Sequence, residues 1–151
     1  RAPPRPHTVT RKNLPPGLHL DTLAVRAAVD KSQYGENSEA LFITSSFVNP
    51  DAETAARRFA NEEEAFVYSR FSNPTVAMFE ARMASFEGVE AARATATGMA
   101  AVTAALMGQV KAGDHIVSAR ALFGSCRYVI EEWLPRFGVA STLIDVSVDI
   151  E

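Results

Sequence analysis

The second half of this sequence alternates stretches of helical periodicity with short apolar segments, and that alternation limits the possible folds most strongly. Asn73 and Pro74 are an N-cap residue and a first-turn proline, and Gly88 supplies the matching stop signal. Between them, apolar side chains recur at helical spacing and predict one buried stripe: Val76, Phe79, Met83 and Phe86.

Further helices and strands follow by the same criteria. Residues 91–97 are, apart from Arg93, small and neutral and predict a buried strand, whereas Gly98 opens a helix with so little polar face that it should be buried. The pattern then predicts a strand over 115–118, a helix over 125–137 and a strand over 139–144. Strands separated by helices imply right-handed crossovers, so the expected fold class is α/β, with a parallel-type sheet and helices on both faces.

The first fifty residues have a different character. Five of the eight prolines lie in the first seventeen positions, which favours an extended segment. Residues 21–31 predict a short helix with Asp21 as its N-cap, and residues 35–50 predict an extended stretch whose apolar side chains need a partner. We therefore expect residues 1–50 to form an N-terminal arm with a short helix, distinct from residues 51–151.

Composition excludes several classes of function. The chain has 15 Lys and Arg against 18 Asp and Glu, a net charge of -3, so no basic field points to nucleic acid or to an anionic membrane. No apolar stretch is long enough to span a bilayer. Cys126 is the single cysteine, which is typical of a reducing compartment, so a cytoplasmic location is expected. The three histidines have no partners at metal-ligand spacing, so no metal site is expected.

Two loops at the carboxyl ends of predicted strands are candidate binding sites, because ligands of open parallel sheets lie there. In residues 95–99, Thr97 offers a hydroxyl and Gly98 permits close approach of a phosphate to the backbone N–H groups of a helix start. The same two residues also suit an ordinary helix cap. In residues 119–125, Phe123 has two interpretations, a ring stacked on a flat heterocycle or a core side chain.

A third candidate precedes the helix that starts at Asn73. Tyr68 and Arg70 lie two residues apart, and a phenol with a guanidinium can hold an anionic group such as phosphate. The alternative is an exposed arginine beside a half-buried tyrosine at the helix entry.

Together, several short segments resemble one family in order and spacing: Tyr68-Ser69-Arg70, Asn73-Pro74-Thr75, Thr97-Gly98-Met99-Ala100-Ala101, Ala112-Gly113-Asp114-His115 and Leu122-Phe123-Gly124-Ser125. The family is that of the Cys/Met-metabolism pyridoxal-phosphate enzymes, the trans-sulfuration enzymes, which are similar to aspartate aminotransferase (fold type I). The resemblance extends from about residue 18 to the last residue. It implies that residues 51–151 are the first part of the pyridoxal-phosphate-binding domain, incomplete at its C-terminal end.

The resemblance implies a pyridoxal 5'-phosphate cofactor and an active site shared between subunits. Tyr68 and Arg70 would reach across a dimer interface to the phosphate of the neighbouring subunit, and Tyr68 would also act in proton transfer. The arm, residues 1–50, would pack on that neighbour. The implied partners are a small amino-acid substrate and further copies of the same chain, as dimers assembled into a tetramer.

Within one subunit, the resemblance assigns the phosphate to Thr97 and to the amides of Gly98 and Met99. Phe123 stands where many members have a tyrosine on the cofactor ring, so stacking is kept and the hydroxyl is lost. A Phe-Gly-Ser sequence here is most similar to the O-succinylhomoserine sulfhydrylases, which make homocysteine from O-succinylhomoserine and sulfide in methionine biosynthesis. The alternative within the family is cystathionine γ-synthase or γ-lyase.

The lysines do not match the family's Schiff-base lysine. Lys12, Lys31 and Lys111 stand in a different sequence context, and the family's lysine and pyridine-binding aspartate come later in its sequences. We therefore expect this chain to be the N-terminal part of a longer enzyme and to be inactive alone. The alternative from another class is a noncatalytic fragment or interaction module that pairs with full-length subunits.

Overall fold

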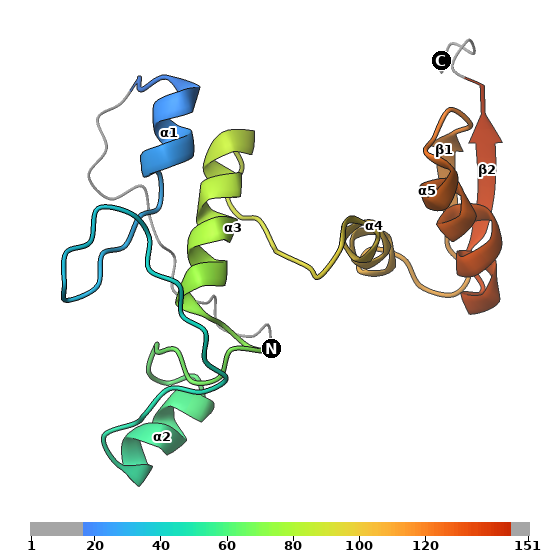
Figure 1. Ribbon diagram of the computed structural model, residues 1–151. Coiled ribbons are helices and arrows are strands. Elements are labelled where there is room, and N and C mark those ends of the chain that lie inside the picture. The colour runs from blue at the N-terminus through green and yellow to red at the C-terminus, as the bar shows by residue number, and fades with distance from the viewer. Residues whose placement is uncertain (1–16, 146–151) are drawn as a thin grey trace. The chain divides into compact units, whose positions relative to one another are not determined.

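The computed structural model describes residues 17–145, which form two compact units, one ending at Ala94 and one beginning at Thr95. The first unit contains three helices, α1 (Leu20–Arg26), α2 (Ala52–Phe59) and α3 (Pro74–Glu87) (Figure 1). The second contains α4, a pair of strands and one long helical run, with these bounds: α4 (Gly98–Met107), β1 (His115–Ala119), α5 (Gly124–Tyr128), η1 (Val129–Trp133), η2 (Leu134–Phe137) and β2 (Ala140–Ile144).

Helix α3 begins and ends at the predicted residues. The Asn73 side chain accepts from the Thr75 N–H, Pro74 opens the helix, and Gly88 closes it in the left-handed conformation with φ 65°. The predicted buried stripe is wrong, since Val76 and Phe79 are exposed and the buried residues are Ala77, Met78 and Ala84. The reason is that α3 packs on α1, and the face turned inward carries small or flexible side chains.

Helix α1 is shorter than predicted and starts one residue earlier. Its N-cap is His19, not Asp21, and the His19 ring accepts from the Asp21 N–H at 3.4 Å. The helix ends at Arg26 because Ala27 is extended and Ala28 takes a positive φ of 61°, which no helix continues. Residues 51–59, acidic first and basic last, have the charge order of a helix, and α2 forms there with the Asp51 carboxylate accepting from the Thr54 N–H at 2.6 Å.

The predicted strand over residues 91–97 is wrong. This segment is irregular and mostly exposed, and the Ala94 N–H donates to the Glu80 carboxylate at 2.8 Å rather than to a neighbouring strand. A strand needs a second backbone beside it to pair its N–H and C=O groups. No segment among residues 17–145 supplies that backbone.

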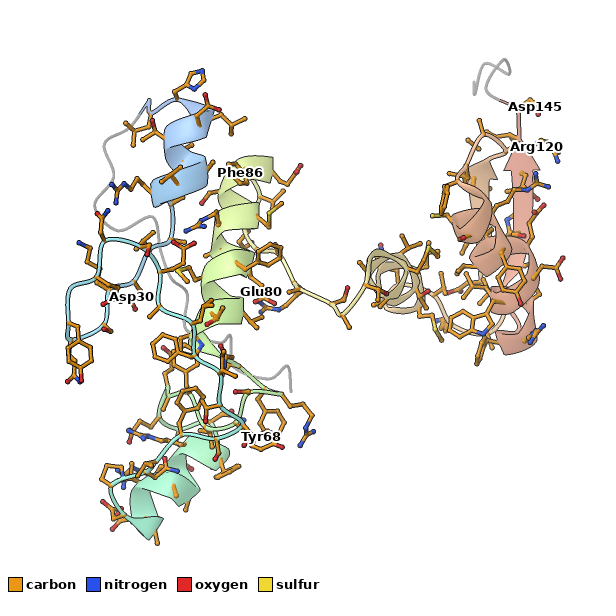
Figure 2. All side chains as sticks on the ribbon, viewed as in Figure 1. Asp30, Tyr68, Glu80, Phe86, Arg120 and Asp145 are labelled. Atoms are coloured by element: carbon orange, nitrogen blue, oxygen red, sulfur yellow. The ribbon has the colours of Figure 1, made fainter. Side chains whose placement is uncertain are left out.

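The second unit has the predicted α/β order. β1 and β2 are parallel, in register from His115 opposite Ala140 to Ala119 opposite Ile144, and the helical run connects them. Arg120 and Asp145 lie at the same end of this sheet and form an ion pair of 3.1 Å (Figure 2). The predicted helix over 125–137 is present from Gly124, but it changes from α to π to 3-10 geometry and stops at Gly138, with φ 77°.

The core of the second unit lies between the helical run and the sheet. Val129, Leu134 and Val139 are buried there, and the partly buried side chains around them are Met99, Leu106, Val110, Ile116 and Trp133. Helix α4 contributes to this core but has no fully buried residue, so the prediction that it is buried is wrong for the described part of the chain.

Candidate functional site

Tyr68, labelled in Figure 2, lies in a tight turn just before α3. Arg70 belongs to the same turn. The Tyr68 carbonyl accepts from the Phe71 N–H at 2.9 Å and from the Ser72 N–H at 3.1 Å, so Ser69 and Arg70 occupy the middle of the turn. The Arg70 guanidinium carbon lies 5.5 Å from the centre of the Tyr68 ring and 4.7 Å from that of Phe71. The turn therefore holds the phenol and the guanidinium together.

The charge of Arg70 has no acidic partner among the described residues. Every other arginine in residues 17–145 except Arg136 donates to a carboxylate or a side-chain amide. Stacking on two aromatic rings orients the guanidinium without using its N–H groups. Arg70 can therefore donate to an external anion.

A neighbouring extended segment, residues 42–47, supports the turn. The Ser69 N–H donates to the Ser45 carbonyl at 2.9 Å, the Phe47 N–H donates to the Val67 carbonyl at 3.1 Å, and Ser46 and Tyr68 form an antiparallel bridge. The extended stretch predicted from the sequence is thus present, without regular strand pairing. Its partner over these residues is the backbone just before the Tyr68 turn.

Thr97 caps the start of α4 and leaves donors free there. Its side-chain oxygen accepts from the Ala100 N–H at 3.0 Å, so the hydroxyl proton remains able to donate. The N–H groups of Gly98 and Met99 have no acceptor among the described residues. The Met99 side chain packs against the buried core and so anchors this turn. Three donors therefore lie at the positive end of one helix.

Phe123 lies in the loop that follows β1 and directly precedes α5. Its side chain is 73% exposed, and its backbone is extended with φ -56° and ψ 133°. The loop is held by a Leu122 N–H donating to the Arg120 carbonyl at 2.9 Å and by the Arg127 N–H donating to the Phe123 carbonyl at 3.1 Å. The core interpretation of Phe123 is wrong for this chain, and the ring is open to a flat partner.

The predicted site residues are divided between the two units of the structure. Tyr68 and Arg70 belong to the first unit, and the other candidates, Thr97, Gly98, Met99 and Phe123, belong to the second. Within residues 17–145, no group of three or more His, Cys, Asp or Glu side chains could hold a metal ion. None of the helices described there is long and apolar enough to cross a membrane.

The free donors at the start of α4 suit a phosphate, and the exposed Phe123 ring of the same unit is open to a flat partner. The sequence agrees, because it matches the profile of the Cys/Met metabolism PLP-dependent enzymes over residues 21–150, almost the whole chain. The chain belongs to this family.

Two O-succinylhomoserine sulfhydrylases are similar to this chain in sequence. The chain is 46% identical over 136 residues to an O-succinylhomoserine sulfhydrylase of Mycobacterium tuberculosis, covering 90% of this chain and 34% of that protein. It is 48% identical over 123 residues to the O-succinylhomoserine sulfhydrylase of Pseudomonas aeruginosa, covering 82% of this chain and 30% of that protein. The chain spans about a third of the length of these relatives.

A solved structure of the Cys/Met family has the same fold. A putative O-acetylhomoserine (thiol)-lyase from Campylobacter jejuni, which contains a pyridoxyl-lysine phosphate, matches with a TM-score of 0.80 at 27% identity. The match covers 87% of this chain and 31% of that one. The predicted fold type I architecture is therefore confirmed, with α/β structure and parallel strands.

Proposed function

We propose that this sequence belongs to a pyridoxal-phosphate enzyme that converts O-succinylhomoserine and sulfide to homocysteine. In this γ-replacement, the bond between Cγ and the ester oxygen breaks, succinate leaves, and a sulfide sulfur bonds to Cγ. The proposal is supported by identities of 46% and 48% to two O-succinylhomoserine sulfhydrylases. The single structural observation that carries it is the α4 start, where a hydroxyl and two unpaired amides suit a phosphate.

The described residues fit pyridoxal phosphate as the cofactor. Thr97, Gly98 and Met99 would bind the phosphate through one hydroxyl and two N–H groups. Phe123 would stack on the pyridine ring, for which its side chain is sufficiently exposed. When bound, pyridoxal phosphate supplies an electron sink that allows the substrate to lose its Cα proton and its γ-substituent.

Tyr68 and Arg70 would act together from a neighbouring subunit. Arg70 would donate to the phosphate, since its guanidinium has no acidic partner among the described residues. Tyr68 would hold or move a proton at its phenol oxygen. This arrangement requires at least a homodimer, in which the arm of residues 1–50 packs on the second subunit and residues 51–151 begin the cofactor domain. We also propose assembly into a tetramer and a cytoplasmic location.

The phosphate role of Arg70 is tested in the full-length enzyme with the variant Arg70→Ala. Losing a charged hydrogen bond should weaken pyridoxal-phosphate affinity by at least about tenfold. Arg136→Ala is the matched control, because Arg136 is the other described arginine without an acidic partner. Affinity is measured by adding cofactor back to apoenzyme, and borohydride reduction followed by intact-mass measurement detects the lysine-bound form. Equal affinities in both variants would remove Arg70 from the site.

Substrate assays test the reaction itself. Full-length enzyme should release homocysteine from O-succinylhomoserine and sulfide faster than from the O-acetyl ester. Turnover with cysteine in place of sulfide would instead identify a cystathionine γ-synthase, and cleavage of cystathionine a γ-lyase. No turnover with any of these substrates would favour a noncatalytic interaction module.

A further inference from the structure

Asn73 bonds three groups with one buried side chain. Its oxygen accepts from the Thr75 N–H at 2.9 Å and caps α3. Its amide nitrogen donates to the Phe42 carbonyl at 2.9 Å and to the Ser69 hydroxyl oxygen at 3.0 Å. A primary amide has two protons to donate, so both are used. The side chain is 6% exposed, and water therefore competes little for these bonds.

Ser69, which Asn73 holds, is the residue between Tyr68 and Arg70. The Ser69 hydroxyl accepts from Asn73 and donates to the Thr44 carbonyl, while the Ser69 N–H donates to the Ser45 carbonyl. The Ser69 hydroxyl and N–H are thus bonded to the N-cap residue of α3 and to residues 44–45. The turn cannot rotate about its ends without breaking these bonds.

The segment opposite the turn is held by the same helix start. The Phe42 N–H donates to the Thr75 hydroxyl oxygen at 2.9 Å, and the Phe42 carbonyl accepts from Asn73. Asn73 therefore joins three pieces of backbone: the start of α3, the turn at Ser69 and the extended chain at Phe42. Capping α3 would require only the oxygen atom.

We propose that Asn73 is a positioning residue for phosphate binding by Tyr68 and Arg70. This inference rests on the proposed function of those two side chains. An arginine loses considerable rotamer entropy when it binds, and a turn fixed in advance reduces the additional loss. Asn73 supplies that fixation through Ser69, without touching the cofactor itself.

The test uses full-length apoenzyme and two probes, pyridoxal 5'-phosphate and pyridoxal. The dissociation constant of pyridoxal divided by that of pyridoxal 5'-phosphate is the ratio that measures how much the phosphate contributes to binding. Asn73→Asp keeps the oxygen that caps α3 but removes both N–H donors, so the ratio should fall about fivefold. A role in stability alone would lower the melting temperature of the apoenzyme and leave the ratio unchanged.

Asn49→Asp is the matched control. It makes the same chemical change in the same unit, but the Asn49 side chain accepts from Arg58 at 3.0 Å, and a carboxylate keeps that bond. We expect its ratio to equal that of the wild type. Ser69→Ala is a second test that leaves the α3 cap intact, and it should lower the ratio. Ser69→Thr keeps the hydroxyl and should give the wild-type ratio.

The double variant Asn73→Asp/Arg70→Ala tests whether Asn73 affects phosphate binding through Arg70. If Asn73 acts through Arg70, the double variant should show a smaller loss than the product of the single losses. A wild-type ratio in Asn73→Asp and Ser69→Ala, with a lowered ratio in Arg70→Ala, overturns the inference alone. An unchanged ratio in Arg70→Ala overturns the phosphate role and the inference together.

Discussion

At the scale of single residues, the Thr97 hydroxyl can serve both as an acceptor and as a donor. Its oxygen caps α4, and its hydroxyl proton is free for a phosphate. Thr97→Val loses both and should cost about 1 kcal/mol of helix stability, together with about tenfold in cofactor affinity. Thr97→Ser keeps both groups and should remain within about twofold of wild-type affinity. Apoenzyme reconstitution and thermal unfolding measure the two effects, and equal affinities of the two variants would contradict the role.

Phe123 allows a prediction that separates stacking from substrate choice. The Phe123 ring is exposed, and the Phe123 side chain makes no capping hydrogen bond to α5. Phe123→Tyr therefore adds a hydroxyl without displacing a described neighbour. Cofactor affinity should stay within about twofold, because either ring stacks. The ratio of kcat/KM for the succinyl and acetyl esters should change more. An altered cofactor affinity with an unaltered substrate ratio would contradict this division.

The sequence and the family resemblance predict the candidate site residues, but they do not include Ser69 and Asn73, which we propose to position Tyr68 and Arg70. Asn73 was interpreted only as an N-cap, because that role depends on the next few residues alone. Its second and third bonds reach Ser69 and, 31 positions earlier, Phe42. The only signal in the sequence was their place within the segments that resemble the family.

At the scale of secondary-structure elements, Arg82 fastens α1 to α3. It donates to the Ala27 carbonyl at 3.1 Å, just after α1, and to the Glu39 carboxylate at 2.7 Å. The Arg82 guanidinium holds the pKa of Glu39 below its ordinary value through this hydrogen bond. The bond therefore stabilises the fold fully above the ordinary pKa of a glutamate, and that stabilisation is lost as the pH falls through the lowered value.

This pH dependence predicts the behaviour of Glu39→Gln. At neutral pH the variant should show faster hydrogen exchange in α1 than the wild type, after correction for intrinsic rates. The difference in exchange should shrink in acid, where the wild-type carboxylate is protonated and is then neutral, as the glutamine of the variant is. Glu53→Gln is the control, since its partner Arg57 lies in α2 and α1 should be unaffected. Identical α1 exchange in wild type and Glu39→Gln at neutral pH would contradict the role of the pair.

The caps of α3 and α4 were easier to predict than the pairing of residues 91–97. Asn73 and Thr97 lie where the sequence indicates a cap, because a cap is a bond between residues two or three positions apart. Residues 91–97 have the composition of a strand, yet their outcome depended on a second backbone to pair with. No described residue supplies that backbone, and the Glu80 carboxylate accepts from the Ala94 N–H instead.

At the scale of the whole molecule, much apolar surface is open. Ile43 and Val48 are 94% and 95% exposed, and α4 has no buried residue although nearly all its side chains are apolar. Exposed apolar surface of this extent is usually covered by another protein surface or drives self-association. The polypeptide of 151 residues expressed alone should therefore bind a hydrophobic dye and form oligomers.

Substitution of the open residues tests that expectation. Ile43→Thr and Val48→Thr together should lower dye binding without changing helix content, since neither side chain is packed in the described structure. Leu134→Ala is the opposite case, because this fully buried core side chain should cost about 2–5 kcal/mol and raise dye binding. Size-exclusion chromatography and circular dichroism give the readouts. A monomeric wild-type chain that binds no dye would contradict the expectation.

The sequence by itself determined the α/β order of the second unit, the caps of α3 and α4 and the family, because these depend on periodicity, on near neighbours and on short motifs in fixed order. It also placed free backbone donors at the start of α4, since a helix start leaves its first N–H groups free wherever it occurs. Only the tertiary structure decided which face of α3 is buried, that residues 91–97 are irregular, and that Asn73 holds Ser69 and Phe42. These outcomes depend on which distant backbone or side chain comes within bonding distance, and local sequence carries no record of that distance.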